Sequence, residues 1–236
     1  MITQTTIDNL VTEARSDLHM HTKWSDGRES VLEMVEASEK MGLSTIAITD
    51  HGKALAMAGG IKSEQLADYL MDIDAAKGKS KIRILKGIEA NIAKDGSLDY
   101  TLDEFKLFDF VIASIHSSFD LPIEEQTARL IKAIEHPEVD VIGHPTGEDY
   151  GTRPPIDIDW ERVFEACVKN KVALELNAID SRIGIASELL WKAKKMGVKF
   201  TLGSDSHTTY SLPTIQQSIL RAQRAGLTED DLLWNW

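Results

Sequence analysis

Residues 109–115 read DFVIASI, an apolar run of strand length that ends directly before His116. Its Ile and Val residues continue on both faces, which is typical of a strand buried in a parallel sheet. Six further runs of similar length and composition occur along the chain; they are 16–21, 44–49, 81–92, 139–143, 172–177 and 198–204. Segments whose apolar residues recur with a helical period separate these runs. The chain therefore alternates strand and helix, which indicates an α/β fold.

Local signals agree with this alternation. Ser30 and Glu33 have the spacing of a capping box that opens the first helix. Pro122 stands where the first residue of a later helix is expected. Gly42 and Gly197 each follow a Lys-Met pair, where glycine can adopt the left-handed conformation that ends a helix. Seven strands with intervening helices predict a closed or nearly closed (β/α) barrel, with a doubly wound open sheet as the alternative.

Composition sets the class of protein. The 236 residues include 38 acidic and 26 basic side chains, which gives a net charge of −12 and argues against extended nucleic-acid binding. The single cysteine, Cys167, lies on an apolar helical face and can form no intrachain disulfide, so a reducing compartment is expected. The chain has no apolar run approaching the ~20 residues of a membrane span and no signal-peptide pattern. We expect a cytoplasmic protein that does not enter a membrane.

Six of the seven histidines stand at or just beyond the carboxyl end of a predicted strand: His19, His21, His51, His116, His144 and His207. Three carboxylates share these positions: Asp26, Glu89 and Asp205. A lone histidine at a strand end is usually a hydrogen-bonded structural residue, but six at corresponding ends are not explained that way. The carboxyl ends of all strands in a barrel open on one face, so we expect these side chains to converge on one site.

The type and number of these side chains indicate a metal centre. His19 and His21 are two residues apart, so both imidazoles point to the same face of a strand. One zinc ion takes about four ligands, and nine candidate ligands therefore suit two or three ions. A set without thiolates favours Zn²⁺, Mn²⁺ or Fe. Clustered ions of this kind bind phosphoryl oxygens and lower the pKa of a bound water.

These residues occur in ordered motifs that resemble the PHP (polymerase and histidinol phosphatase) family. The motifs are Asp17-Leu18-His19-Met20-His21, Thr49-Asp50-His51, Gly87-Ile88-Glu89, Ser114-Ile115-His116, Gly143-His144-Pro145 and Ser204-Asp205-Ser206-His207. The resemblance spans about residues 16–210. It implies a distorted seven-stranded (β/α)7 TIM-like barrel and a trinuclear metal centre. We expect a single domain over residues 1–236, with a helical tail at 211–236.

The resemblance also implies which side chains hold each ion. All nine ligand positions of the family are filled in this sequence. The first ion would be held by His19, His21, Glu89 and Asp205. The second would be held by Asp26, His51 and His207, and Glu89 would bridge to a third ion held by His116 and His144.

Within the family, three stretches look most like the C-terminal PHP region of bacterial family X DNA polymerases: 24–27, 58–60 and 113–119. In that region Asp26 replaces a histidine that other members use. The chain contains no counterpart of the polymerase or of its helix-hairpin-helix parts. We therefore expect a stand-alone domain that keeps phosphoester chemistry without processive work on DNA.

The expected reaction is hydrolysis of a phosphate ester, a phosphomonoester of a small molecule or nucleotide, by a hydroxide that bridges two metals. Asp205 or a histidine of the cluster such as His207 would pass a proton to the leaving oxygen. Arg153, in the long segment 144–156, is the candidate for a bidentate phosphate contact, with a solvated loop arginine as the alternative. The glycine-punctuated loop 52–61 is either a lid or substrate wall, or ordinary packing.

Three other functions remain as alternatives. The first is a nuclease or 3'-end phosphodiesterase acting on DNA. The second is an amidohydrolase-type metal hydrolase. The usual amidohydrolase pattern has a bridging lysine in mid-barrel, where this chain has Glu89. The third is a non-catalytic metal-binding interaction module. A module that has lost its activity should also have lost ligands, and this chain retains all nine.

Two further features of the sequence concern contacts. Asn177 ends the sixth predicted strand and either contacts substrate or supports a ligand. Trp234 and Trp236 form either a packed tail or an oligomer contact.

Overall fold

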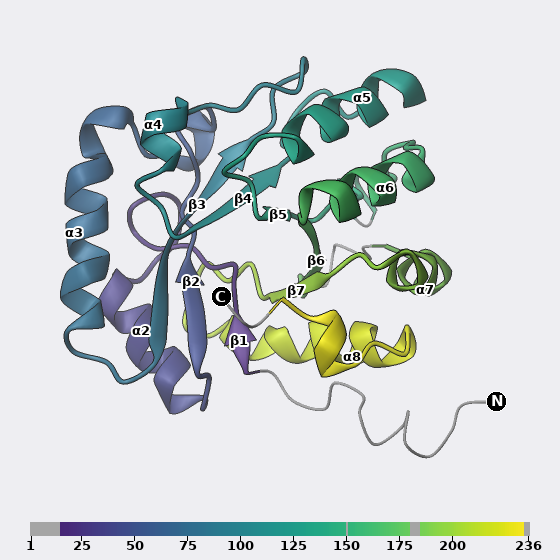
Figure 1. Cartoon of the computed structure of the whole chain (residues 1–236). Coiled ribbons are helices and arrows are strands. Elements are labelled where there is room, and N and C mark those ends of the chain that lie inside the picture. Colours follow the sequence, from purple (N-terminus) through teal and green to yellow (C-terminus); the bar gives the residue numbers. More distant parts are fainter. Residues whose placement is uncertain (1–14, 150, 180–184, 234–236) are drawn as a thin grey trace.

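The computed structural model describes residues 15–149, 151–179 and 185–233. Seven parallel strands form one sheet in the order of the sequence (Figure 1). They are β1 Ser16–Asp17, β2 Thr45–Ile48, β3 Arg83–Asn91, β4 Phe110–Ser114, β5 Val141–Ile142, β6 Ala173–Asn177 and β7 Phe200–Gly203. The seven predicted strands are confirmed, with β1 and β5 much shorter than expected. Trp234 and Trp236 lie outside the described residues.

The sheet closes on itself between its first and last strands. Leu18 donates a backbone hydrogen bond to Leu202 at 2.9 Å, and Met20 pairs in parallel with Ser206. Each other strand pairs with its neighbour in sequence, as in the register of Ile46 with Ile84 between β2 and β3. The (β/α)7 barrel is therefore confirmed, and the open doubly wound alternative is wrong because its strand order would not run from one to seven.

Helices cover the outside of this ring (Figure 1). They are α2 Val31–Lys40, α3 Leu66–Lys77, α4 Leu102–Phe105, α5 Ile123–Ile134, α6 Trp160–Asn170, α7 Ser187–Met196 and α8 Ile215–Arg224. Short 3-10 helices add η1 Ala56–Ala58, η2 Ser63–Gln65, η3 Leu212–Thr214 and η4 Glu229–Asp231. The segment after residue 211 is thus helical over much of its described length.

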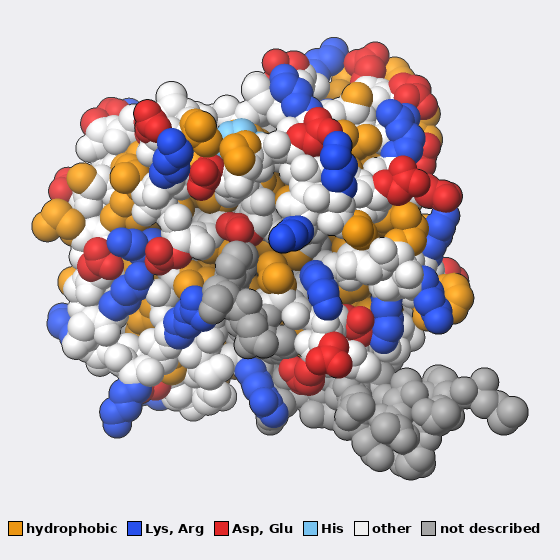
Figure 2. Space-filling model, in the orientation of Figure 1, with side chains coloured by type: hydrophobic (Ala, Val, Ile, Leu, Met, Phe, Trp, Pro, Cys, Tyr) orange, Lys and Arg blue, Asp and Glu red, His pale blue; other side chains and the backbone are white. Residues whose placement is uncertain are grey.

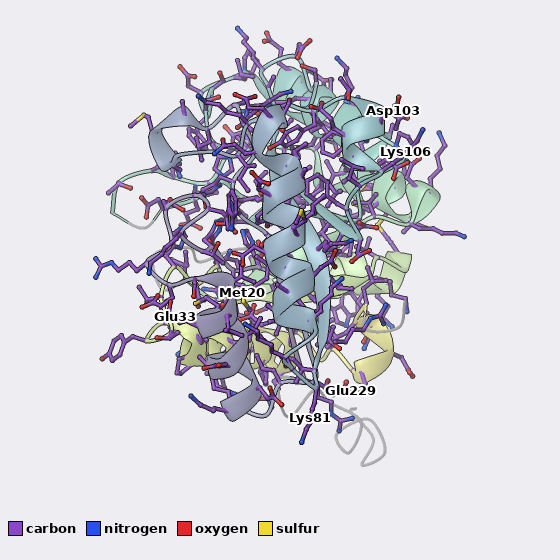
Figure 3. The ribbon with its side chains drawn as sticks, turned by 90° about the vertical axis from the view of Figure 1, so that its left-hand side faces the viewer. Met20, Glu33, Lys81, Asp103, Lys106 and Glu229 are labelled. Atoms are coloured by element: carbon purple, nitrogen blue, oxygen red, sulfur yellow. The ribbon has the colours of Figure 1, made fainter. Side chains whose placement is uncertain are left out.

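The predicted helix ends are largely confirmed. Ser30 and Glu33 form the capping box of α2, and Figure 3 labels Glu33 in the first turn of that helix. Gly42 and Gly197 have φ of 83° and 96°, so both adopt the left-handed conformation that L side chains disfavour. Pro122 caps α5 from outside rather than occupying its first position, because its ψ of 149° is extended.

The inside of the barrel changes character along each strand. Leu85, Phe110 and Ala173 belong to a buried apolar cluster. Glu89 lies four residues after Leu85 on β3, and the side-chain period of two places both on the same face. The barrel interior is therefore apolar near the amino ends of its strands and polar at the carboxyl ends, where the site lies.

The larger apolar cluster packs between the strands and the helices, and it includes Cys167 of α6. Burial raises the pKa of this thiol to about 12. The prediction that Cys167 is part of the core is confirmed. Among the described residues, no helix is long and apolar enough to cross a membrane.

Candidate metal centre

The chain after β1 brings the first two histidines to the carboxyl end of the barrel. His19 and His21 are fully buried, with their ring centroids 5.1 Å apart. His21 Nε2 lies 3.1 Å from Oδ1 of Asp205, which follows β7. Asp205 has a φ of 53°, a left-handed backbone that non-glycine residues adopt rarely. Such conformations occur where the surrounding structure fixes a functional side chain.

Glu89, near the end of β3, is the centre of the cluster and is 1% exposed. Its two carboxylate oxygens lie within 4 Å of five imidazoles: 2.7 Å from His51 Nδ1, 2.8 Å from His144 Nε2, 3.3 Å from His116 Nε2, 3.5 Å from His19 Nε2 and 3.7 Å from His21 Nε2. One carboxylate in this place can therefore share two ions, as the bridging assignment requires.

Asp26 lies at the outer rim of the same cluster and is partly exposed. Its carboxylate is 3.3 Å from His207 Nε2, 3.6 Å from His51 Nε2 and 3.9 Å from His21 Nδ1. The loop that carries Asp26 is held by buried Asp50. The carboxylate of Asp50 accepts hydrogen bonds from the backbone N–H and the hydroxyl of Thr22, at 2.8 Å each. On the face shown in Figure 2, histidine is visible only as a small patch near the upper edge.

The nine predicted ligand positions meet at this one end of the barrel. Eight of them fall into three groups whose ligand atoms lie within 4.8 Å of one another: His21, Asp26, His51 and His207; His19, His21 and Asp205; His51, Glu89 and His116. His144 stands outside these groups but contacts Glu89 directly. His21 and His51 each belong to two groups, so the groups form one continuous centre.

Buried atoms without a hydrogen-bond partner test whether this centre suits metal ions. Five ligand atoms make no hydrogen bond of regular geometry among the described residues: His19 Nε2, His21 Nδ1, His51 Nδ1, Glu89 Oε2 and His116 Nε2. Two of them, His51 Nδ1 and Glu89 Oε2, face each other as an ion pair at 2.7 Å. A buried polar atom left unpaired costs about 1–3 kcal/mol. Imidazole nitrogens and carboxylate oxygens are ligands for zinc, manganese and iron. The residues therefore fit divalent ions, which would satisfy these atoms together.

The charges of the cluster support the same conclusion. Burial, together with His51 and His207, lowers the pKa of His21 to about 3, so this imidazole is neutral and able to ligate. Burial also lowers the pKa of His51, but Glu89 and Asp26 outweigh it and raise the value to about 10. A proton thus balances the carboxylates at His51, and a divalent ion would take its place on binding.

Glu175 is a buried carboxylate beside the ligand cluster that the sequence motifs do not reveal. It lies on β6 with 3% exposure, and its Oε1 accepts a hydrogen bond from His19 Nδ1 at 2.7 Å. Its Oε2 accepts one from the backbone N–H of His144 at 2.6 Å. A carboxylate on the far nitrogen of a ligating histidine fixes its tautomer and orientation. Gly203 makes the room, since a Cβ there would lie 2.1 Å from Glu175 Oε1.

A signal for Glu175 exists in the sequence, because a glutamate in the middle of the buried run 172–177 requires a partner. Asn177 lies two residues further on, with contact to substrate or support of a ligand as its two expected roles. Its Nδ2 donates to Asp205 Oδ2 at 3.0 Å, so the structure favours the supporting role.

A hollow of about 360 Å³ adjoins the centre. It is lined by Asp26, Leu55, Met57, Ala58, Ile115, His116, Phe119, His144, Gly147 and Arg153. The loop 52–61 forms one wall of this hollow through Leu55, Met57 and Ala58. This placement agrees with a role as a substrate wall, which was one of the two predicted for the loop. The guanidinium of Arg153 lies over the ring of Phe119 at 3.6 Å, and its Nε donates to the backbone carbonyl of Gly147 at 2.6 Å. Arg153 is thus placed at the edge of this hollow.

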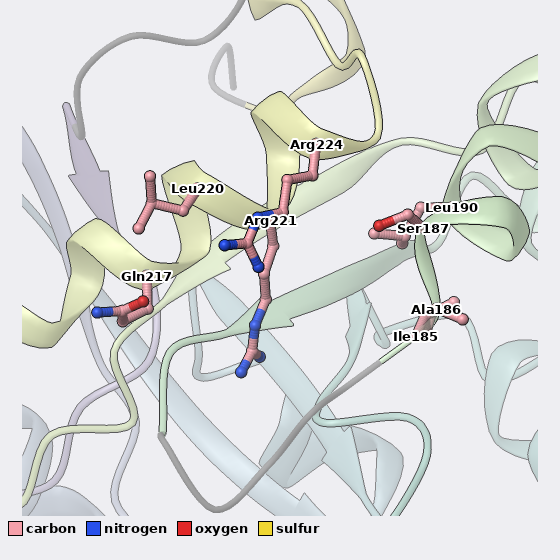
Figure 4. Close-up of a pocket in the computed structure, with 8 residues that line it drawn as sticks. All are labelled: Ile185, Ala186, Ser187, Leu190, Gln217, Leu220, Arg221 and Arg224. Atoms are coloured by element: carbon pink, nitrogen blue, oxygen red, sulfur yellow. The ribbon is translucent and has the colours of Figure 1, made fainter.

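A second hollow, of about 380 Å³, lies between α7 and α8 and shares no lining residue with the first (Figure 4). Arg221 and Arg224 of α8 line it together with Gln217 and the start of α7. Arg221 donates to the backbone carbonyl of Asn177. This hollow therefore contacts the end of β6 rather than the ligand cluster.

The fold and the centre together define a class of protein. A closed (β/α) barrel with a buried cluster of imidazoles and carboxylates at its carboxyl end is the scaffold of a metal-dependent hydrolase. The chain belongs to the PHP domain family, whose match covers residues 17–229. Both the predicted family and the predicted class, a metal-dependent hydrolase of phosphate esters, are confirmed at this level.

Two relatives illustrate the range of this family. The chain is 41% identical over 218 residues to the DNA polymerase/3'-5' exonuclease PolX of Bacillus subtilis (strain 168); the match includes 92% of this chain but only 38% of that protein. It is 34% identical over 229 residues to a probable phosphatase of Thermoanaerobacter sp. (strain X514), and this match includes 92% of this chain and 89% of the phosphatase.

A solved structure of similar fold is the histidinol phosphate phosphatase of Lactococcus lactis subsp. lactis Il1403 in complex with zinc, L-histidinol and phosphate. It superposes with a TM-score of 0.65 at 22% identity, covering 90% of this chain and 94% of that one. This likeness shows that the two chains share a fold.

Proposed function

We propose that this chain hydrolyses phosphomonoesters of a small molecule or nucleotide, using three divalent ions. The observation that carries the proposal is the set of five buried ligand atoms around Glu89 that make no regular hydrogen bond, beside a hollow of about 360 Å³. The 34% identity to a probable phosphatase along 89% of that protein's length supports it. A cytoplasmic location and a small phosphorylated substrate, rather than extended nucleic acid, belong to this proposal.

The nine ligands are assigned to three positions. His19, His21, Glu89 and Asp205 hold the first position; Asp26, His51 and His207 hold the second; His116, His144 and the shared Glu89 hold the third. Divalent ions in these positions supply an activated water and neutralise charge on phosphoryl oxygens. The ions are zinc, manganese or iron, as the thiolate-free ligand set favours.

The chain's own residues bind and orient the ester. Arg153 contacts the phosphate with two parallel N–H groups, and Phe119 and Gly147 fix its side chain at the edge of the hollow. Asp205 is assigned to proton transfer toward the leaving oxygen, with its carboxylate held in place by the Asn177 Nδ2 hydrogen bond to Oδ2. His207 is kept as a ligand, because its Nδ1 lies 2.9 Å from the Asp205 carbonyl and its Nε2 faces the second position. Two lysines near the site, Lys23 and Lys53, are not assigned to the phosphate. Lys23 is exposed and pairs with Glu33, and Lys53 donates a hydrogen bond to Ser63.

The leaving group lies along the apolar wall. Leu55, Met57 and Ala58 from the loop 52–61 line the same hollow as Ile115 and Phe119. A wall of this composition contributes non-directional affinity for an apolar leaving group. Met57 is fully exposed in the protein alone, so its side chain is available for that contact. The volume of the hollow, about 360 Å³, suits a small molecule or a single nucleotide.

A second candidate is a phosphodiesterase that removes nucleotides from a DNA 3' end. The observation that favours it is the 41% identity with the Bacillus subtilis DNA polymerase/3'-5' exonuclease. The chemistry at phosphorus would be the same, and only the leaving group would differ. The face shown in Figure 2 mixes acidic and basic side chains rather than presenting a continuous basic stripe.

One experiment separates these candidates. The metal content of the purified chain is measured, and hydrolysis of a phosphomonoester, a phosphodiester and single-stranded DNA is followed with Mn²⁺ and with Zn²⁺. We expect the monoester to be hydrolysed with the highest kcat/KM. Faster release of nucleotides from DNA would favour the second candidate, and no turnover of any substrate by fully metal-loaded protein would contradict both.

A further inference from the structure

Arg129 of α5 is one of the largest fully buried side chains in the fold, at 1% exposure. None of the ion pairs found among the described residues involves it, and its hydrogen bonds go to carbonyl and amide oxygens. Burial lowers the pKa of its guanidinium. Because a buried cation without a carboxylate partner is costly, the groups that surround it should explain why it is there.

The acceptors of Arg129 belong to two separate segments of the chain. Its Nε donates to the carbonyl of Ala93 at 2.8 Å, and its Nη2 donates to the carbonyl of Ile92. Its Nη1 donates to the carbonyls of Ser117 and Ser118 at 3.0 and 3.2 Å. The first pair follows β3 and the second pair follows β4. One planar group therefore joins the two chain segments that leave neighbouring strands of the barrel.

These two segments carry ligands of the metal centre. His116 directly precedes Ser117, and Glu89 is three residues before Ile92 on β3. His116 Nε2 lies 3.3 Å from Glu89 Oε1, and its Nδ1 lies 3.3 Å from Asn91 Oδ1. The distance between these ligands therefore depends on how the two segments are held together.

The backbone beyond His116 needs such a support. Ser118 has a φ of 55°, in the left-handed region that is unfavourable for a serine. Its carbonyl accepts from Arg129 Nη1 and also from Gln126 Nε2 at 2.8 Å. Gln126 is fully buried one turn before Arg129 on α5, and its Oε1 lies 3.4 Å from Arg129 Nη1.

We propose that Arg129 is a positioning residue that sets His116 against Glu89 and so shapes the metal position that these two ligands share. A guanidinium presents five N–H groups in a rigid planar fork, whereas a lysine presents three from a single atom. Only the fork can reach all four carbonyls at once. The inference rests on the proposed metal centre and not on the identity of the phosphate ester.

The test compares three variants of the full chain: Arg129→Lys, Gln126→Ala and Lys132→Met. Lys132 is the matched control, because it lies one turn along α5 and donates to the carbonyl of Asp95 in only one of the two segments. Each protein is loaded with Zn²⁺, and the number of ions per chain and the affinity of each are measured by competition with a chelator. Circular dichroism reports whether each variant is folded.

We expect Arg129→Lys to weaken the binding of one ion by about 10- to 100-fold, the usual effect of losing a group that orients a metal ligand. The other ions should keep their affinities, and Lys132→Met should bind zinc as the unaltered chain does. A purely structural role for Arg129 would instead weaken all ions together or none. Either of those results in folded Arg129→Lys would overturn the proposal.

If Arg129→Lys does not fold, Gln126→Ala decides the question. It removes one of the two donors to the Ser118 carbonyl, so it should weaken the same single ion by a smaller factor. Unchanged affinity for every ion in folded Gln126→Ala would then overturn the proposal. These measurements stand even if no phosphoester is hydrolysed, so a failure of the proposed function remains distinguishable.

Discussion

The two ends of the barrel interior are built from the same strands but do different work. On β3, Leu85 is part of the apolar cluster and Glu89 is the centre of the ligand cluster. On β6, Ala173 and Glu175 are related in the same way. The amino end stabilises the barrel by burying apolar side chains away from water. The carboxyl end brings together imidazoles and carboxylates that are suited to binding metal ions. The comparison predicts that substitutions will separate stability from metal binding according to the end they affect.

The largest effect on activity is expected at the carboxyl end. Glu89→Ala removes the carboxylate that five imidazoles share, so kcat/KM should fall by ~1000-fold or more, the upper range for loss of one electrostatic contributor. Bound metal per chain should fall as well, with the circular dichroism spectrum kept. Glu125→Ala on α5 is the control. Unchanged metal content in Glu89→Ala would remove Glu89 from the centre.

The opposite end should respond in the opposite way. Phe110→Ala leaves a cavity in the apolar cluster, and the free energy of unfolding should fall by ~3–5 kcal/mol. Denaturant titration of the metal-free and metal-loaded protein measures this loss. The folded fraction should keep its kcat. A large fall in kcat with unchanged stability would show that the two ends are not independent.

Glu175 sharpens the comparison because it belongs to the polar end without being one of the nine ligands. Glu175→Gln keeps the shape of the side chain but weakens its hold on His19 Nδ1. We expect metal affinity to fall by about 10- to 100-fold. Chelator competition checks this value, and unaltered affinity would show that the carboxylate does not orient His19.

Arg153 tests the edge of the hollow. Arg153→Ala should raise KM for a phosphomonoester and lower kcat/KM by about 10- to 100-fold, the equivalent of ~1.5–3 kcal/mol for its charge-assisted contact with the phosphate. Metal content should not change. Arg162→Ala is the control, because Arg162 is exposed and pairs with Glu124. Equal kinetics in the two variants would assign Arg153 to the solvated loop instead.

The smallest effect is expected at Cys167, outside the barrel. Burial raises the pKa of this thiol to about 12, so almost no thiolate is present at neutral pH. A thiol reagent should not label the native protein and should label it fully in denaturant. Labelling of the native protein at neutral pH would show that the helical layer opens more readily than the apolar packing suggests.

The sequence predicts that the nine side chains meet at one end of the barrel, because barrel geometry brings the carboxyl ends of all strands together. It does not predict Glu175 or Arg129, since their roles depend on which distant side chain or carbonyl each one meets after folding. The sequence also overestimates strand lengths, because the residue at which pairing stops depends on contacts with distant segments of the chain. After Asp17 the regular ladder with β2 stops. On that side the chain keeps a backbone hydrogen bond from Thr49 N to the Met20 carbonyl, and on the other side it bonds to the segment beyond β7, as from His21 N to the Ser206 carbonyl.

The contact between His21 and Asp205 joins residues 184 positions apart, and the closure of the sheet at β1 and β7 brings them together. Contacts of such long sequence separation form late, because the intervening chain must be ordered first. During synthesis, the first ligands emerge long before their partners exist. Because the proposed ligands come from both ends of the chain, a complete metal centre requires a closed barrel, and bound metal can serve as a reporter of that closure.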